Sequence, residues 1–189
     1  MIFRSADIDE AAIGDRASDP AELVLLLGEA KAEALLPGLK AEAAAGSLGS
    51  TTILLTGDQG KKEAFVVHEG RILEKPAGED EVRRNILGYG RSPCRTVGSV
   101  VLTDVLTGRQ VSGVDTAEIS FDEIPQDVVT QLCIEGTVLQ CAGGLMIEHP
   151  LVQPYISKID GTVDSVMGLS KALVLRLLEG FDDGDPSSK

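Results

Sequence analysis

The sequence has 189 residues, 43% of them apolar and 25% charged, a length that supports one substantial hydrophobic core. Its net charge of −13 opposes DNA, RNA and anionic lipid, and no local basic patch is visible in the sequence to offset that charge. The first residues lack a basic flank followed by an apolar region, and no run approaches the roughly twenty apolar residues of a membrane span. We therefore expect a soluble cytoplasmic protein of one compact domain that binds neither nucleic acid nor membrane.

The cysteines and histidines argue against a disulfide framework and against a zinc site. The cysteines are Cys94, Cys133 and Cys141, which form no CxxC motif, and the histidines His68 and His149 are far apart in the chain.

The first half of the chain predicts a helix, a strand and a hairpin. Residues 20–36 have helical apolar spacing, open with Asp19 and Pro20, and are expected to stop at Pro37 and Gly38. The run TTILLTG predicts a buried strand that ends in a loop at Gly57 and Asp58. Residues 65–76 follow as a hairpin turned at Glu69 and Gly70.

The second half predicts three more helices and a pair of long strands. Residues 78–90 form a short helix with an acidic first turn, and residues 96–107 and 110–121 form an antiparallel pair joined at Gly108. A helix at 124–136, bounded by Pro125 and Gly136, precedes a loop-rich stretch at 141–168. A final amphipathic helix begins near Ser170. Helices interleaved with parallel and antiparallel strand candidates favour a mixed α/β sheet in one domain.

Seven segments, in this order along the chain, resemble the Maf family of septum-formation-inhibitor-like proteins. They are FRSADIDE (3–10), GEAKAEA (28–34), LLTGDQ (54–59), GRILEKP (70–76), AEISF (117–121), CAGGLMIE (141–148) and GTVDSVMGL (161–169). Members of this family share an elongated mixed α/β fold with a cleft between two lobes. They hydrolyse nucleoside triphosphates to monophosphate and pyrophosphate with a divalent metal.

The resemblance implies a nucleotide pyrophosphatase domain over residues 1–181, a polar tail over 182–189, and Mg²⁺ or Mn²⁺ as cofactor. Asp58 matches the family's proton acceptor, and Glu10 matches an acidic pocket residue. Lys31 and Lys75 match the pocket lysines. This set suits the reaction, because phosphoanhydride hydrolysis needs a carboxylate for the water, a metal to bridge phosphate oxygens, and cations to offset developing charge. Asp58 and Glu10 are the candidate metal ligands.

The base of the nucleotide is expected to be guanine-like. Glu148 stands where many relatives have a glutamine that reads the base, and a carboxylate can accept the N1–H and N2–H bonds of guanine. Gln59 together with Glu148 resembles the eukaryotic, plant-like Maf branch that favours 7-methyl-GTP.

Two of these assignments have structural alternatives. Asp58 after a buried strand is also typical of a turn former or a helix cap. Lys31 shares its predicted helix with Glu22, Glu29 and Glu33, so it is also compatible with a solvated, charged helix face.

The chain departs from the family pattern at its start, where relatives have a strand and an LASxSPRR loop that supplies a serine and two arginines. Residues 91–95 (RSPCR) echo this loop but are expected to be an ordinary loop between a helix and a strand. The segment GKKEAF after Gln59 is an insertion, in which Lys61 and Lys62 form an exposed charged loop or partly replace lost cations.

Three accounts follow from this departure. The first is an active pyrophosphatase. The second is a catalytically weak Maf-fold protein that binds nucleotides or partners. The third is a chain that needs a second copy, as a homodimer, to cover an exposed sheet edge. We rank them in this order because Glu10, Lys31, Asp58 and Lys75 occur in the family's order.

Overall fold

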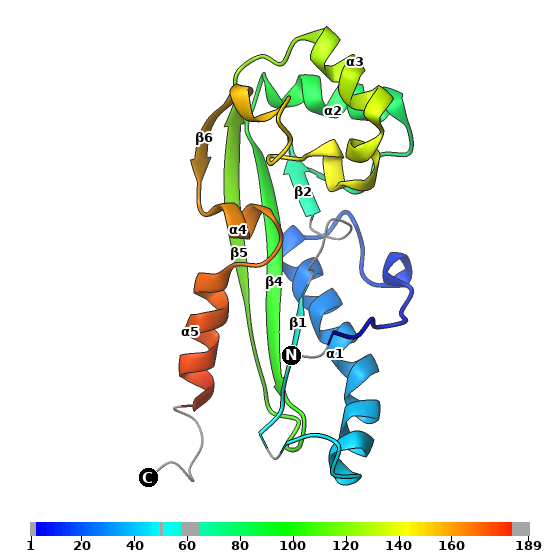
Figure 1. The fold of residues 1–189 in the computed structure, drawn as a ribbon, viewed down its shortest axis with the longest axis vertical. Helices are drawn as coiled ribbons and strands as arrows, with labels where there is room; N and C mark the ends of the chain where they lie inside the picture. Colours follow the sequence, from blue (N-terminus) through cyan, green and yellow to red (C-terminus); the bar gives the residue numbers. More distant parts are fainter. Residues whose placement is uncertain (1–2, 50, 58–64, 183–189) are drawn as a thin grey trace. The chain divides into compact units, whose positions relative to one another are not determined.

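The computed structural model describes residues 3–49, 51–57 and 65–182 (Figure 1). For residue 182, only the backbone is described. The chain divides into two compact units. Unit 1 contains residues 1–58, 99–114 and 171–189, and unit 2 contains residues 59–98 and 115–170. The long strands β4 (Cys94–Asp104) and β5 (Gln110–Phe121) contribute to both units.

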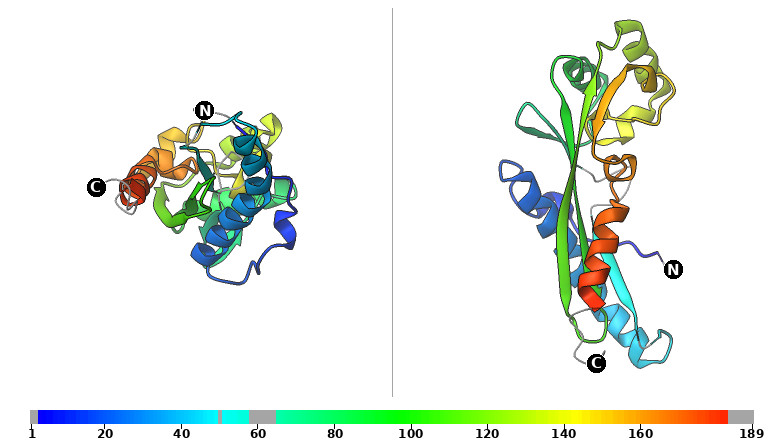
Figure 2. Two further views of the ribbon diagram at one scale, coloured as in Figure 1. Left: turned by 90° about the horizontal axis from the view of Figure 1, so that it is seen from below. Right: turned by 90° about the vertical axis from the view of Figure 1, so that its left-hand side faces the viewer.

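Unit 1 is built from helix α1 (Pro20–Ala44), strand β1 (Ile53–Gly57), helix α5 (Lys171–Asp182) and its shares of β4 and β5. A short 3₁₀ turn, η1 (Glu10–Ala12), precedes α1. α1 and α5 lie on opposite faces of these strands (Figure 2). α5 begins directly after Ser170, as predicted, and Arg109 donates to the carbonyl of Phe181 at 2.9 Å, which fastens the end of α5 to the turn between β4 and β5.

Helix α1 is longer than the sequence predicted. Its start is as expected, because Asp19 caps the Ala21 N–H at 2.7 Å and Pro20 occupies the first turn. The expected stop at Pro37 is wrong, because the helix continues to Ala44 with the proline inside it. An internal proline removes one helical hydrogen bond, at a cost of about 3 kcal/mol. The helix-forming residues that follow, and the burial of Leu39, offset that cost.

A close approach at Gly28 fixes α1 against β1 and β4. A Cβ at Gly28 would lie 3.0 Å from both Ser99 Oγ and Val101 Cγ2, so a larger residue would push the helix away. Two buried hydroxyls tie the same surface together. Thr56 Oγ1 donates to the Gly28 carbonyl at 2.8 Å, and Ser99 Oγ donates to the Val24 carbonyl at 2.6 Å.

Unit 2 contains the predicted hairpin and the helices that pack on it. The hairpin consists of β2 (Phe65–His68) and β3 (Arg71–Leu73). Its turn residues Glu69 and Gly70 have φ of 50° and 75°, the left-handed pair that a two-residue turn requires. Helices α2 (Glu79–Tyr89) and α3 (Gln126–Glu135) pack against each other. α3 ends at Gly136 with φ 73°, as predicted.

The segment predicted as loop-rich contains more regular structure than expected. It holds the 3₁₀ turns η3 (Ala142–Gly144) and η4 (Gln153–Tyr155), strand β6 (Ile156–Asp160) and helix α4 (Val163–Val166). Another turn, η2 (Thr137–Gln140), follows α3. β6 is a short edge strand, and its half-buried Ile156 and Ile159 are separated by two exposed residues, so it lacks the period-two alternation of a typical strand. Such a strand carries little periodic signal in the sequence.

The described strands form one six-stranded sheet in the order β3-β2-β4-β5-β6, with β1 also paired to β4. β1 pairs with β4 from Ile53–Asp104 to Gly57–Val100. The pairs β1–β4, β2–β3, β2–β4 and β5–β6 are all antiparallel, so the sheet is antiparallel where the sequence left parallel pairing open. The mixed α/β fold class predicted from the sequence is confirmed.

Candidate active site

In unit 1 the structure brings together two of the predicted site residues, Glu10 and Lys31. Lys31 Nζ lies 3.1 Å from Glu10 Oε1. Lys31 is only 7% exposed, while the Glu10 side chain retains 24% of its accessible surface. The alternative of a solvated lysine on a charged helix face is therefore wrong. A buried ammonium needs a charge partner, and α1 places this one beside a carboxylate.

The position of Lys31 follows from the packing of α1. Leu27, Gly28, Lys31 and Ala32 are buried residues on the same side of the helix, at the spacing of one helical turn. Because Gly28 sits against Gly57, Ser99 and Val101, the next turn of this face carries Lys31. The approach at Gly28 thus positions the lysine.

The backbone that carries Glu10 is held by Arg16, a residue that the sequence reasoning missed. The Arg16 guanidinium donates to the carbonyl of Glu10 at 2.9 Å and also to the carbonyl of Ile13. These two bonds clamp the ends of η1. No motif in the sequence marks Arg16, because the two carbonyls that it binds are brought together only by the folded turn.

Two predicted residues lie outside the part of the chain that the structure describes. Asp58 and Gln59 fall in residues 58–64, as do Lys61 and Lys62. The element before them is clear: β1 ends at Gly57, where the sequence predicted that a strand would end.

In unit 2, Lys75 follows β3 and is exposed, and the next residue, Pro76, is buried. Its backbone is tied to a second predicted site segment, because the Gly143 N–H donates to the Glu74 carbonyl at 2.8 Å. This bond links the end of the hairpin to the CAGGLMIE segment, which carries Glu148.

Tyr89 holds the glycine pair of that segment in place. Tyr89 Oη donates to the Gly143 carbonyl at 2.7 Å, and the Tyr89 ring stacks on Phe121. Gly143 has φ 60°, and a Cβ there would overlap the Tyr89 hydroxyl, so only glycine fits. Burial, with a smaller contribution from Cys94, raises the pKa of Tyr89 well above 10, so the hydroxyl stays a donor.

Glu148 is exposed in a turn that follows the buried Ile147. The adjacent His149 fixes this turn. Its Nδ1 accepts the Leu151 N–H at 3.2 Å, so Nε2 carries the ring proton and donates to Glu135 Oε2 at 2.9 Å. The Glu148 carboxylate thus stands on a braced turn and is accessible to a ligand.

Residues 91–93 form the expected connection, but Cys94 and Arg95 already belong to β4, where a loop was expected. α2 ends at Tyr89 and β4 begins at Cys94. The Cys94 thiol is not a nucleophile near neutral pH, because burial raises its pKa to about 12.

The described part of the chain does not form a metal cage from protein side chains alone. Within residues 3–49, 51–57 and 65–182, no three His, Cys, Asp or Glu side chains gather into a set that could ligate a metal. Mg²⁺ commonly takes one or two carboxylates together with phosphate oxygens of the substrate. The partly exposed Glu10 carboxylate can supply one such oxygen.

A family model described as Maf-like protein matches residues 1–181. The chain belongs to the Maf family. A 7-methyl-GTP pyrophosphatase of Dictyostelium discoideum is 37% identical to this Maf protein over 174 residues, which span 92% of this chain and 83% of the relative. A nucleoside triphosphate pyrophosphatase of Streptomyces coelicolor is 30% identical over 178 residues, 94% of this chain and 78% of the relative.

A dTTP/UTP pyrophosphatase of Deinococcus radiodurans is more distant, at 29% identity over 163 residues, 86% of this chain and 74% of that protein. The described helices of this Maf protein include none long and apolar enough to cross a bilayer.

Proposed function

We propose that this protein hydrolyses nucleoside triphosphates between the α and β phosphates, releasing a nucleoside monophosphate and pyrophosphate. The buried Lys31–Glu10 pair carries the proposal. It places a cation and a carboxylate in contact on residues that match the family's pocket, in a chain whose relatives are named pyrophosphatases. If the enzyme requires a second copy, its activity will depend on protein concentration.

Each residue has a separate task in this proposal. Asp58 orients the attacking water and takes its proton as the water oxygen bonds to phosphorus and the bridging P–O bond breaks. Lys31 and Lys75 offset the charge that develops on the phosphate oxygens. Glu10 orients Lys31 and, with Asp58, would hold a divalent cation.

A divalent cation, Mg²⁺ or Mn²⁺, held by these carboxylates would neutralise part of the charge on the phosphate groups. The need is strong here because the chain carries a net charge of −13 and the substrate is itself a polyanion.

The substrate is proposed to carry a guanine-type base, including 7-methylguanine, which Glu148 reads through the N1–H and N2–H donors. Gln59 is the second residue assigned to base specificity. Two observations support this. Glu148 is exposed on a braced turn, and the relative with 37% identity is named a 7-methyl-GTP pyrophosphatase. A carboxylate has no donor for the carbonyl oxygens of uracil or thymine.

The central test measures pyrophosphate release from GTP and 7-methyl-GTP by the wild type and by Asp58→Asn, Glu10→Gln and Lys31→Met. Loss of one charge-stabilising group should lower kcat about 10²–10³-fold, and Asp58→Asn should abolish release. The chain offers matched controls. Glu42→Gln breaks the exposed ion pair with Arg4 on the same unit, and Lys40→Met removes an exposed lysine from α1. Both controls should keep full activity.

Two outcomes would contradict the proposal. One is release that Asp58→Asn leaves unchanged. The other is a rise in melting temperature on adding nucleotide with no pyrophosphate released, which would identify a binding protein instead. Activity that falls with dilution together with the oligomeric mass would show that a second copy is required.

Base preference needs its own test. The wild type should turn over 7-methyl-GTP and GTP at least tenfold better than UTP, and Glu148→Gln should narrow that ratio. Comparable turnover of UTP by the wild type and by Glu148→Gln would remove Glu148 as the base reader.

A further inference from the structure

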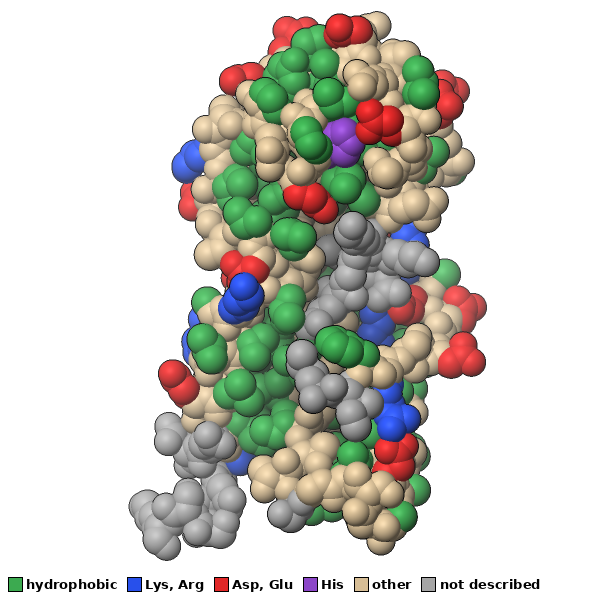
Figure 3. All heavy atoms as spheres, in the orientation of Figure 1, with side chains coloured by type: hydrophobic (Ala, Val, Ile, Leu, Met, Phe, Trp, Pro, Cys, Tyr) green, Lys and Arg blue, Asp and Glu red, His purple; other side chains and the backbone are tan. Residues whose placement is uncertain are grey.

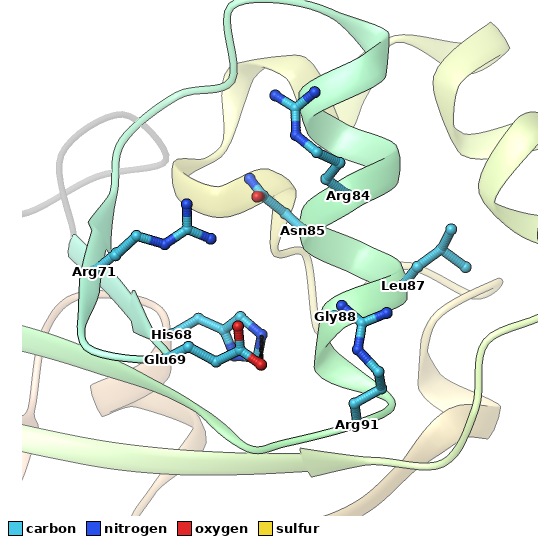
Figure 4. A pocket seen from close by; sticks show the side chains of 8 residues that line it. All are labelled: His68, Glu69, Arg71, Arg84, Asn85, Leu87, Gly88 and Arg91. Atoms are coloured by element: carbon cyan, nitrogen blue, oxygen red, sulfur yellow. Dashed lines mark ion pairs between the residues drawn. The ribbon is translucent and has the colours of Figure 1, made fainter.

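Unit 2 contains a pocket of about 270 Å³ between the β2–β3 hairpin and helix α2 (Figure 4). Its lining includes none of the residues assigned above to substrate, metal or base. The residues that line it are His68, Glu69, Arg71, Arg84, Asn85, Leu87, Gly88 and Arg91. Figure 4 shows Arg71 approaching from the hairpin side and Asn85 from the helix side, both toward the open space between them.

Two buried side chains of this pocket have polar atoms without a hydrogen-bond partner among the residues that the structure describes. They are His68 Nε2 and Asn85 Nδ2, and the residues are 4% and 6% exposed. A buried amide N–H₂ without an acceptor costs about 1–3 kcal/mol. Such a group therefore indicates a missing partner. Asn85 Nδ2 is a donor, so the partner it lacks is an acceptor.

The His68 ring is held with Nε2 in the pocket. Its Nδ1 donates to the Pro93 carbonyl at 3.3 Å, and the nearest carboxylate oxygen, on Glu69, is 3.9 Å from Nε2, too far for a hydrogen bond. A Cβ at Gly88 would lie 2.8 Å from Nε2 and 3.6 Å from Arg91 Nη2. The absence of that carbon lets the imidazole and the Arg91 guanidinium meet at Gly88.

The three arginines of the pocket have no carboxylate partner among the residues that the structure describes. Arg83, next to Arg84 on α2, shows the contrast, because it lies 3.8 Å from Glu79 and donates to Thr130 at 2.9 Å. One acidic residue, Glu69, also lines the pocket, and its carboxylate accepts a bond from Ser92 at 3.3 Å. Three arginines against one glutamate leave the pocket with a charge of +2 when His68 is neutral.

This local charge is opposite to that of the protein, which carries −13 overall. On the face drawn in Figure 3, acidic side chains are spread over many places. The three guanidinium groups that line this one pocket therefore form a local concentration of positive charge. Guanidinium forks match the oxygens of phosphate groups, which they bind through paired hydrogen bonds.

We propose that this pocket binds a compact phosphate-class oxyanion, inorganic phosphate or pyrophosphate, with Asn85 Nδ2 as the buried donor and Arg71, Arg84 and Arg91 as the charged rim. Its size favours a small ion, because pockets for drug-sized ligands have volumes of about 300–1,000 Å³. The ion supplies the acceptor that Asn85 lacks and neutralises the arginine cluster.

The test is calorimetric titration of the full chain with sodium phosphate and, separately, with sodium pyrophosphate. Comparing the two titrations shows whether the pocket prefers inorganic phosphate or pyrophosphate. Arg71→Gln combined with Arg84→Gln should weaken binding about a hundredfold, since each charge-assisted pair contributes about tenfold. Arg95→Gln is the matched control, because Arg95 is an exposed arginine of unit 2 outside the pocket and its loss should leave binding unchanged.

Asn85→Leu separates a binding role from a structural one. It removes the buried donor with a side chain of similar size, so phosphate binding should fall about tenfold while the melting temperature stays equal or rises. Nitrogen-15 spectra give a direct readout, because the Asn85 side-chain amide and the arginine Nε–H signals should shift on adding phosphate.

The same titration on Asp58→Asn and Lys31→Met distinguishes this pocket from the proposed catalytic site. Both variants should bind phosphate in the pocket as the wild type does. The proposal would be overturned if the double variant Arg71→Gln/Arg84→Gln bound phosphate with an affinity within twofold of that of the control variant Arg95→Gln. So would an Asn85 amide signal that does not move at saturating phosphate.

Discussion

Adjacent glycines in the CAGGLMIE segment give a sharp test of how this loop is held. Gly143 and Gly144 have φ of 60° and 69°, so alanine at either position adopts a left-handed backbone at a cost of about 1–2 kcal/mol. At Gly144 the nearest atom to an added Cβ is 3.6 Å away, an ordinary contact. At Gly143 the added carbon would overlap Tyr89 Oη and lie 3.1 Å from Val66 Cβ.

Gly143→Ala should therefore destabilise the fold more than Gly144→Ala does. The added carbon displaces the Tyr89 hydroxyl, which donates to the Gly143 carbonyl at 2.7 Å, and a buried bond lost in this way costs about 1–3 kcal/mol more. We expect a free energy of unfolding lowered by about 1–2 kcal/mol for Gly144→Ala and by about 2–5 kcal/mol for Gly143→Ala. Urea unfolding followed by far-ultraviolet circular dichroism measures both.

A double-mutant cycle tests the cause. Tyr89→Phe alone should cost about 1–3 kcal/mol because it leaves the Gly143 carbonyl unpaired. In the Tyr89→Phe background the extra cost of Gly143→Ala over Gly144→Ala should shrink, because the hydroxyl that the new carbon meets is gone. Equal losses for the two alanine variants, or a gap unchanged by Tyr89→Phe, would refute this account of the loop.

Three further predictions concern pH, the turn that carries Glu10, and metal. Burial raises the pKa of Cys94 from 9.0 to about 12, so its contribution to stability is complete below pH 9 and is lost as pH rises toward 12. Between pH 8 and 10 the unfolding free energy of the wild type should fall about 1.4 kcal/mol more than that of Cys94→Ala; equal slopes would contradict this. Arg16→Met should lower kcat/KM about tenfold, because it releases η1 and the Glu10 backbone. The exposed control Arg176→Met should leave kcat/KM unchanged, and equal values for the two variants would contradict this role of Arg16. Chelation with EDTA should stop pyrophosphate release, Mg²⁺ or Mn²⁺ should restore it, and full activity in excess chelator would count against a metal.

Local chemistry made several elements predictable. The Glu69–Gly70 turn, the left-handed Gly136 and the Asp19–Pro20 start of α1 each depend on residues adjacent in the sequence. The signal and the structure it causes lie within the same few residues, so the prediction needed no knowledge of tertiary packing.

The features that escaped prediction depend on packing. Pro37 is a strong local stop signal, yet α1 continues through it because the residues beyond it are good helix formers and Leu39 is buried. β6 exists because it pairs with β5 from Glu118–Asp160 onward, a partner that its own five residues do not indicate.

The candidate site shows the same division. The resemblance pointed to Glu10 and Lys31, but their 3.1 Å contact and the burial of Lys31 come from the approach of α1 at Gly28. The sequence showed no basic patch, and the sequence reasoning did not single out Arg71 or Arg84. Only the docking of the hairpin beside α2 brings them together around one pocket.

The way the chain is distributed between the two units affects how the protein can be divided. Unit 1 is assembled from three separate stretches and unit 2 from two, so the chain passes from one unit to the other four times. No single cut separates the two units, because even a fragment that ends at residue 170 and holds all of unit 2 still carries two of the three stretches of unit 1. Expressing either unit alone therefore requires its stretches to be rejoined by new linkers, and a simple truncation will not yield it.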